Sequence, residues 1–241
     1  MPNNQTSVPL FATSQILTAA NMNISAGTGV PVFTNATTRD AAFGGAGEKI
    51  LDEGQMAYLM DNNQLQFYDG STWAGVGLSL KSQVTAITSA LSLPASSFNT
   101  FTNTNYRVIF QVNTPAAATH TLRLRFGGVD DTTANYDYAG VGLTYAGATF
   151  NLNGSAATSI ALGNSVVGNT TSFVFDILSP IISGRRPSIL GSGTTNTAGN
   201  VPGSLTMNAQ NRLTTGFDSM TFTSSASQSM TAYCYAYQGI N

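Results

Sequence analysis

The sequence predicts a mainly β protein: a small N-terminal unit containing a hairpin, followed by an antiparallel, jelly-roll-like β-sandwich. Three observations support this fold class. Apolar and polar residues alternate over several segments, which is typical of half-buried strands. Only 8% of the 241 residues are charged, whereas 42% are hydrophobic and 10% aromatic, so a core is available despite an uncharged surface. The polar residues are mainly Thr, Ser, Asn and Gly, which suit strands and turns.

Charge and hydropathy narrow the classes of function. The net charge is −2 and the pI is about 5.1, so we expect no nucleic-acid partner. No apolar run approaches the ~18 residues of a membrane span, and residues 1–5 lack a secretory pattern, so we expect no membrane insertion. The single cysteine precludes an internal disulfide.

Residues 1–78 are predicted to form the first unit. Thr18 is expected to cap a short helix over 19–22, and Thr38 another over 39–43, with an extended piece at 30–33 between them. Alternation over 56–60 and 65–67, with a turn at 61–63, predicts a hairpin, and a second turn at 69–71 leads to the only tryptophan. The predicted core is Phe33, Tyr58, Phe67, Tyr68 and Trp73. Because this core is thin, we expect packing on neighbouring molecules to complete it.

Residues 79–103 form a connecting segment. Leu80, Val84, Ile87 and Leu91 have the 4-3-4 spacing of a coiled-coil seam, which would suit a trimeric stalk. The segment spans less than two heptads and is rich in Thr and Ser. We predict a strand here, with the stalk as the alternative.

Residues 104–241 contain the clearest alternation, and we predict that they form the sandwich. Glycine-rich turns are expected at 127–128 and 191–193. The apolar faces of four predicted strands are Tyr106, Val108, Phe110 and Val112; Leu122, Leu124 and Phe126; Phe173, Phe175 and Ile177; and Met220 and Phe222.

Residues that could carry chemistry are few. His120 is the only histidine and Cys234 the only cysteine, so neither a zinc site nor a nucleophile–histidine arrangement has enough partners. We interpret both as structural residues on inward strand faces. Asp130, Asp131 and Asp137, with Asn135 between them, could hold a cation, but the spacing is not that of an EF-hand, and a solvated turn is the preferred interpretation. We predict no catalytic residue, no metal site and no cofactor.

Three tyrosines alternate along the last predicted strand. Tyr233, Tyr235 and Tyr237 share one face, and Ala232, Cys234 and Ala236 share the other. Such a row is a candidate subunit contact or glycan contact, because the ring is apolar and the hydroxyl tolerates water. The alternative is that the tyrosine rings fill the core.

The segment 53–73, EGQMAYLMDNNQLQFYDGSTW, resembles a signature of minor structural and tail-fibre proteins of tailed bacteriophages. The lead-in segments 16–23 and 33–42 are similar to those of the same proteins. Two departures are Asn21, where the pattern has an acidic residue, and the loop 44–47, where it has a proline. Downstream, 92–94 through 105–107 and 122–126 look like the start of the β-sandwich modules that often follow.

The resemblance implies a non-enzymatic virion structural protein, made in the host bacterial cytoplasm. We expect a homotrimer in which the N-terminal unit attaches to other virion proteins of the tail, baseplate or capsid. A tail or fibre component that contacts the host surface, with a surface glycan as a candidate ligand, is the preferred hypothesis. The alternatives are a capsid decoration (cement) or head-fibre protein, a stand-alone lectin-like module and, more distantly, a carbohydrate-active enzyme.

Overall fold

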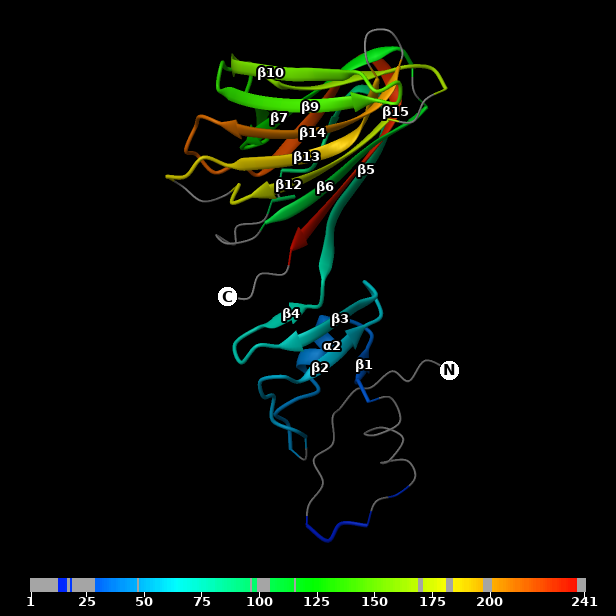
Figure 1. The fold of residues 1–241 in the computed structure, drawn as a ribbon. Helices are drawn as coiled ribbons and strands as arrows, with labels where there is room; N and C mark the ends of the chain where they lie inside the picture. Colours follow the sequence, from blue (N-terminus) through cyan, green and yellow to red (C-terminus); the bar gives the residue numbers. More distant parts are fainter. Residues whose placement is uncertain are drawn as a thin grey trace. The chain divides into compact units, whose positions relative to one another are not determined.

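The computed structural model describes residues 13–16, 18, 29–46, 48–95, 97–98, 105–114, 116–168, 171–180, 184–196 and 201–237. The chain divides into two compact units, residues 1–79 and 80–241. The fold is mainly β, with 61% of the described residues in strands and 3% in helix, which confirms the predicted class at that level. Figure 1 shows both units.

The first unit is built on a four-stranded sheet in the order β1-β2-β3-β4. Strand β1 (Val32–Phe33) is parallel to β2 (Met56–Leu59), whereas β3 (Gln64–Tyr68) and β4 (Trp73–Gly75) continue the sheet in antiparallel fashion. The predicted hairpin is therefore present as β2 and β3. Asn63 closes its turn with a φ of 51°, a left-handed conformation that asparagine tolerates better than most residues.

The helix of this unit, α2 (Ala36–Asp40), begins earlier than the sequence analysis predicted. Asn35 is the N-cap: its side chain accepts a hydrogen bond from the Thr38 N–H at 3.0 Å, and the Thr38 hydroxyl accepts one from the Asn35 N–H at 3.1 Å. Thr38 is thus the third helical residue of a capping box, not the cap. The predicted helix over 19–22 lies outside the described residues. Among the described residues, no helix is long and apolar enough to span a membrane.

Replacing the cap, Asn35→Ala, is expected to destabilise the first unit by about 1 kcal/mol, because the Thr38 N–H at the helix start loses the side-chain oxygen that accepts its hydrogen bond at 3.0 Å. Denaturant unfolding followed by Trp73 fluorescence measures this, since Trp73 is the only tryptophan and packs in this unit. Thr37→Ala, at an exposed helical position, serves as the control and should leave stability unchanged or slightly raised. Equal midpoints for Asn35→Ala and the parent chain would contradict the capping role.

The core of the first unit differs from the predicted set. Its buried members are Phe33, Ala42, Ala57 and Leu59, with Phe43 and Trp73 packed against them. Tyr58, Phe67 and Tyr68 are only half-buried. Strand β2 turns Ala57 and Leu59 inward, so Tyr58 lies on the opposite face, where its hydroxyl hydrogen-bonds Asn63 Oδ1 at 2.9 Å.

A buried arginine side chain, that of Arg39, packs against the same core. Arg39 is 6% exposed, and its guanidinium lies 4.6 Å from the centre of the Trp73 ring. It donates to Gln66 Oε1 and, at 2.7 Å, to Asp40 Oδ1. The burial of Arg39 is therefore offset by an ion pair, an amide acceptor and an aromatic face.

Strand β5 (Leu78–Ser92) crosses the boundary between the two units, so residues 79–92 of the connecting segment are a strand and not a coiled-coil stalk. The other strands are β6 (Tyr106–Thr114), β7 (Ala118–Phe126), β8 (Val129–Asp130), β9 (Tyr136–Thr144), β10 (Thr149–Ala157), β11 (Ile160–Ser165), β12 (Thr171–Leu178), β13 (Ser188–Asn196), β14 (Pro202–Asn211) and β15 (Ser219–Tyr237).

Six of these strands close on themselves in the order β13-β11-β7-β15-β6-β12, because β12 also pairs with β13. Strands β14, β9 and β10 extend the sheet from β13, and Figure 1 shows them side by side. The long β15 pairs with two strands of the ring: residues 219–224 pair with β7, and residues 229–236 pair with β6, with a register shift between Ser229 and Met230. A bent strand of this kind lets one sheet curl over a common core.

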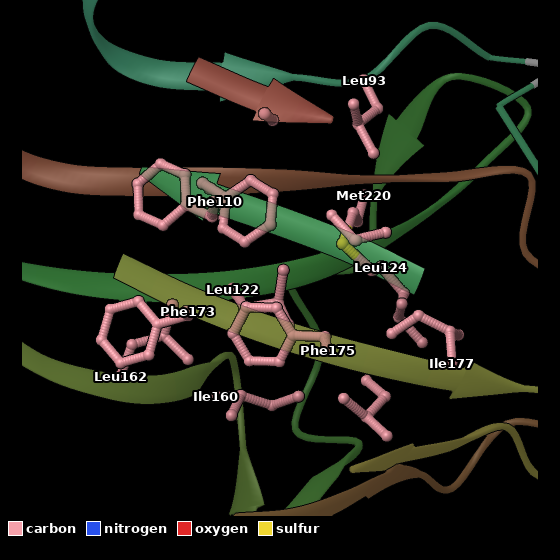
Figure 2. Close-up of a cluster of buried hydrophobic side chains, with 14 of the residues drawn as sticks. Leu93, Phe110, Leu122, Leu124, Ile160, Leu162, Phe173, Phe175, Ile177 and Met220 are labelled. Atoms are coloured by element: carbon pink, nitrogen blue, oxygen red, sulfur yellow. The ribbon is translucent and has the colours of Figure 1, made fainter. Parts of the chain in front are cut away.

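The core of the second unit contains the predicted inward faces (Figure 2). Phe110 stacks on Phe222 with ring centres 4.2 Å apart, and the apolar members predicted for β6, β12 and β15 are all buried. On β7, Leu122 and Leu124 are buried, but Phe126 is 58% exposed, because β7 ends there at the Gly127–Gly128 turn.

The predicted turn at 191–193 is wrong, since these residues lie within β13. A Cβ on Gly191 would come within 2.9 Å of Phe175 Cδ1, and one on Gly193 within 2.5 Å of Phe173 Cδ1. The two glycines therefore allow β13 to pass directly beside the large aromatic rings of β12.

Candidate functional site

His120 lies in a buried polar cluster. It is 1% exposed, and its Nε2 is 2.8 Å from Ser165 Oγ. The Ser165 hydroxyl donates to the Ala116 carbonyl at 2.6 Å, so we assign the Nε2–H tautomer, in which histidine donates to serine. Burial lowers the pKa of His120 to about 4, and the ring is neutral at pH 7.

This cluster lacks the geometry of a nucleophile and its base. The histidine nitrogen that faces Ser165 carries a proton and accepts none, and the serine proton is held by a backbone oxygen. Nδ1 of His120 has no hydrogen-bond partner among the described residues, so no carboxylate orients the ring. The rings of His120 and Phe110 instead pack in a T-shaped arrangement, with ring centres 6.0 Å apart.

Cys234 is equally enclosed. Its side chain is fully buried, with Sγ 3.6 Å from the Ser97 carbonyl oxygen. Burial raises the pKa of the thiol to about 12, so the reactive thiolate is not formed near neutral pH.

The acidic residues of the predicted turn take separate partners. Asp130 forms an ion pair with Arg125 at 3.1 Å, and Asp131 accepts a hydrogen bond from Asn211 Nδ2 at 2.7 Å. Asp137 pairs elsewhere, with Arg212. Within the described ranges, no three His, Cys, Asp or Glu residues gather in a metal-binding arrangement.

The tyrosine row of β15 lies on the outer face of the sheet. Ala232, Cys234 and Ala236 are buried, whereas Tyr233 and Tyr235 are half-buried and stack with ring centres 6.4 Å apart. Of the two arrangements considered from the sequence, the structure places the small residues in the core and the tyrosines outside it.

Tyr237 is held by an ion pair on the neighbouring strands. Arg107 donates from Nε and Nη2 to the two carboxylate oxygens of Asp176, each at 2.8 Å. The Tyr237 hydroxyl donates to Asp176 Oδ1 at 2.7 Å, and the Arg107 guanidinium lies 5.4 Å from the Tyr237 ring centre. The Arg107 contact holds the pKa of Asp176 below its ordinary value.

A second feature of the outer face was not predicted from the sequence. Two adjoining hollows, with volumes of about 510 and 370 Å³, lie over β10, β9 and β14 and share Ala139 and Asn208. We call them together the amide groove. Its lining includes Asn151, Asn153, Thr206, Asn208, Gln210 and Arg212. The polar residues at every second position of 151–153 and 206–210 are the sequence signal that could have indicated it.

One end of the amide groove is closed by an ion pair. Arg212 donates to the two carboxylate oxygens of Asp137, each at 2.7 Å, and to Ser155 Oγ at 3.0 Å. Asp137 also accepts the Ala156 N–H at 3.1 Å, at an irregularity of β10. The Arg212 contact, with this backbone bond, holds the pKa of Asp137 well below its ordinary value.

Comparisons with known proteins supply no relative: no family model, no curated protein and no solved structure matches the chain.

Proposed function

We propose that this chain is a non-enzymatic structural protein of a tailed-phage particle, and that it is a tail or fibre component that contacts the host surface. The resemblance of segment 53–73 to phage virion proteins supports the virion assignment, and that segment contains the β2–β3 hairpin and ends at β4. In this proposal the second unit is a jelly-roll-like module whose closed ring of strands carries an exposed sheet.

The observation that carries the adhesive part of the proposal is the chemistry of that sheet. The outward residues of β13, β14, β9 and β10 are almost all uncharged: Ser188, Leu190, Ser192, Ser204, Thr206, Asn208, Gln210, Ala139, Val141, Leu143, Thr149, Asn151 and Asn153. Val141 and Leu143 are at least half exposed. A broad face of this kind suits contact with another surface more than it suits chemistry.

The histidine and the cysteine, the side chains most suited to catalysis, have structural roles. His120 is neutral and donates to Ser165, and Cys234 is buried with a raised pKa. These contacts support a protein that binds without transforming its ligand.

Presentation in several copies would strengthen weak contacts. Among the residues of the first unit that the structure describes, the buried apolar cluster consists of Phe33, Ala42, Ala57 and Leu59, and this small cluster supports packing on other copies or on virion proteins. We propose a homotrimer attached to the particle through this unit. Linked copies then gain avidity by raising the effective concentration of each further contact.

Imaging of purified particles that carry a labelled copy of the chain tests the location. Label at the tail or fibre tips is the expected result. Label on the head alone would overturn the tail assignment and favour capsid decoration, and particles without label would overturn the virion assignment altogether.

A further inference from the structure

The amide groove arises from the register of three strands. Across β10, β9 and β14, Asn153 lies opposite Ala139, which lies opposite Asn208, and these side chains share the outer face of the sheet. The small Ala139 on the central strand, between longer amides on both sides, leaves a depression along β9. Gly140, beside Ala139, also lines one hollow, and both hollows have the size of small-molecule sites, about 300–1,000 Å³.

The amides that border the depression have no protein partner. Asn151, Asn153, Asn208 and Gln210 are exposed, and among the described residues none of their side-chain amides forms a hydrogen bond. Each amide offers a carbonyl acceptor and two N–H donors. Such groups match hydroxyls, each of which donates and accepts hydrogen bonds at one oxygen.

The charge of the groove selects a neutral ligand. Its two charged lining residues, Arg212 and Asp137, neutralise each other through two bonds of 2.7 Å. An anionic ligand would have to compete with the Asp137 carboxylate for Arg212. Beside the amides, Val141 is 56% exposed and offers an apolar surface to ring C–H groups.

We propose that the amide groove is a binding site for a neutral, hydroxyl-rich oligosaccharide. Asn151, Asn153 and Asn208 bind vicinal hydroxyls across the groove, Val141 and Ala139 contact the C–H face of a sugar ring, and the Arg212–Asp137 pair marks one end. This proposal specifies the ligand class for the host-surface contact proposed above, and it rests on that proposed function. The amide groove is distinct from the tyrosine row on β15, which the sequence indicates as a candidate subunit contact or glycan contact.

The test uses the full chain and a defined set of probes. Oligomers of glucose, mannose, galactose and N-acetylglucosamine are the neutral probes, and oligomers of glucuronic and galacturonic acid are the anionic ones. Binding is measured by calorimetry for the parent chain, for Asn153→Ala with Asn208→Ala, and for Gln111→Ala. Gln111 is an exposed amide on β6, outside the groove lining, and is the matched control.

At least one neutral probe is expected to bind, with the double variant weakened about tenfold or more and Gln111→Ala unchanged, because each lost amide removes hydrogen bonds to the ligand. Absence of binding by every neutral probe, equal binding by the double variant, or preference for the acidic probes would each overturn the proposal. Sedimentation of the same proteins tests whether a second copy of the chain occupies the groove. A change of oligomeric state in the double variant would show that the groove is a subunit interface and would overturn the proposal. These binding results do not depend on where the chain lies in a particle. The imaging experiment above therefore tests the proposed function independently of the binding proposal.

Discussion

Phe110→Ala is expected to destabilise the second unit by about 3–5 kcal/mol, one of the largest effects of any single substitution in this chain. Phe110 is fully buried, stacks on Phe222 with nearly parallel rings whose centres are 4.2 Å apart, and packs in a T-shaped arrangement against His120. Removing the ring loses its transfer free energy and leaves a cavity between β6 and β15. Urea unfolding followed by far-UV circular dichroism gives the free energy of unfolding.

The matched control is Phe126→Ala, because the same atoms are removed from a ring that is 58% exposed. That variant should lie within about 0.5 kcal/mol of the parent chain. If Phe110→Ala fails to fold, Phe110→Leu keeps most of the volume and is expected to fold with a smaller loss. Similar midpoints for the Phe110 and Phe126 variants would contradict the assignment of the core.

The second large effect is a loss of stability in weak acid that depends on His120. Its folded pKa of about 4 lies below the ordinary 6.5, so between these values the unfolded chain binds a proton that the folded chain does not. Stability is therefore full above pH 6.5 and falls as the pH is lowered toward 4. At roughly 1.4 kcal/mol per pH unit, the loss reaches about 3 kcal/mol at pH 4.

Measuring the free energy of unfolding between pH 7 and 5 isolates this effect. His120 is the only histidine, and carboxylates such as Asp69, whose pKa is lowered from 3.8 to about 2, affect stability mainly at lower pH. His120→Gln keeps a donor for Ser165 but does not titrate, so its stability should be nearly flat over this range. A slope that persists in His120→Gln would contradict the burial of a neutral histidine.

The hairpin and several core strands could be predicted because apolar and polar side chains alternate along each of them with a period of two residues. The β2–β3 hairpin has alternation on both sides of an Asp-Asn-Asn turn, and β6 and β12 each carry an unbroken apolar face. Alternation defines two faces but not which one is covered. In β2 the covered face is that of Ala57 and Leu59, so Tyr58 was misplaced.

Other features depend on partners distant in the sequence. The glycines of β13 look like a turn until the rings of Phe173 and Phe175 are known to lie beside them. Helix α2 was placed too late because both Asn35 and Thr38 are good caps, and the capping box uses both. Alternating polar residues at 151–153 and 206–210 indicate exposed strand faces, but they form the amide groove only through the register of β10, β9 and β14, and no local pattern reveals that register.

We propose that this chain is a structural protein of a phage particle. Quantitative mass spectrometry of gradient-purified infectious particles tests this proposal. We expect the chain to sediment with the particles, at a copy number that is a multiple of three. A chain that is absent from the purified particles and found only in the soluble lysate would contradict the account.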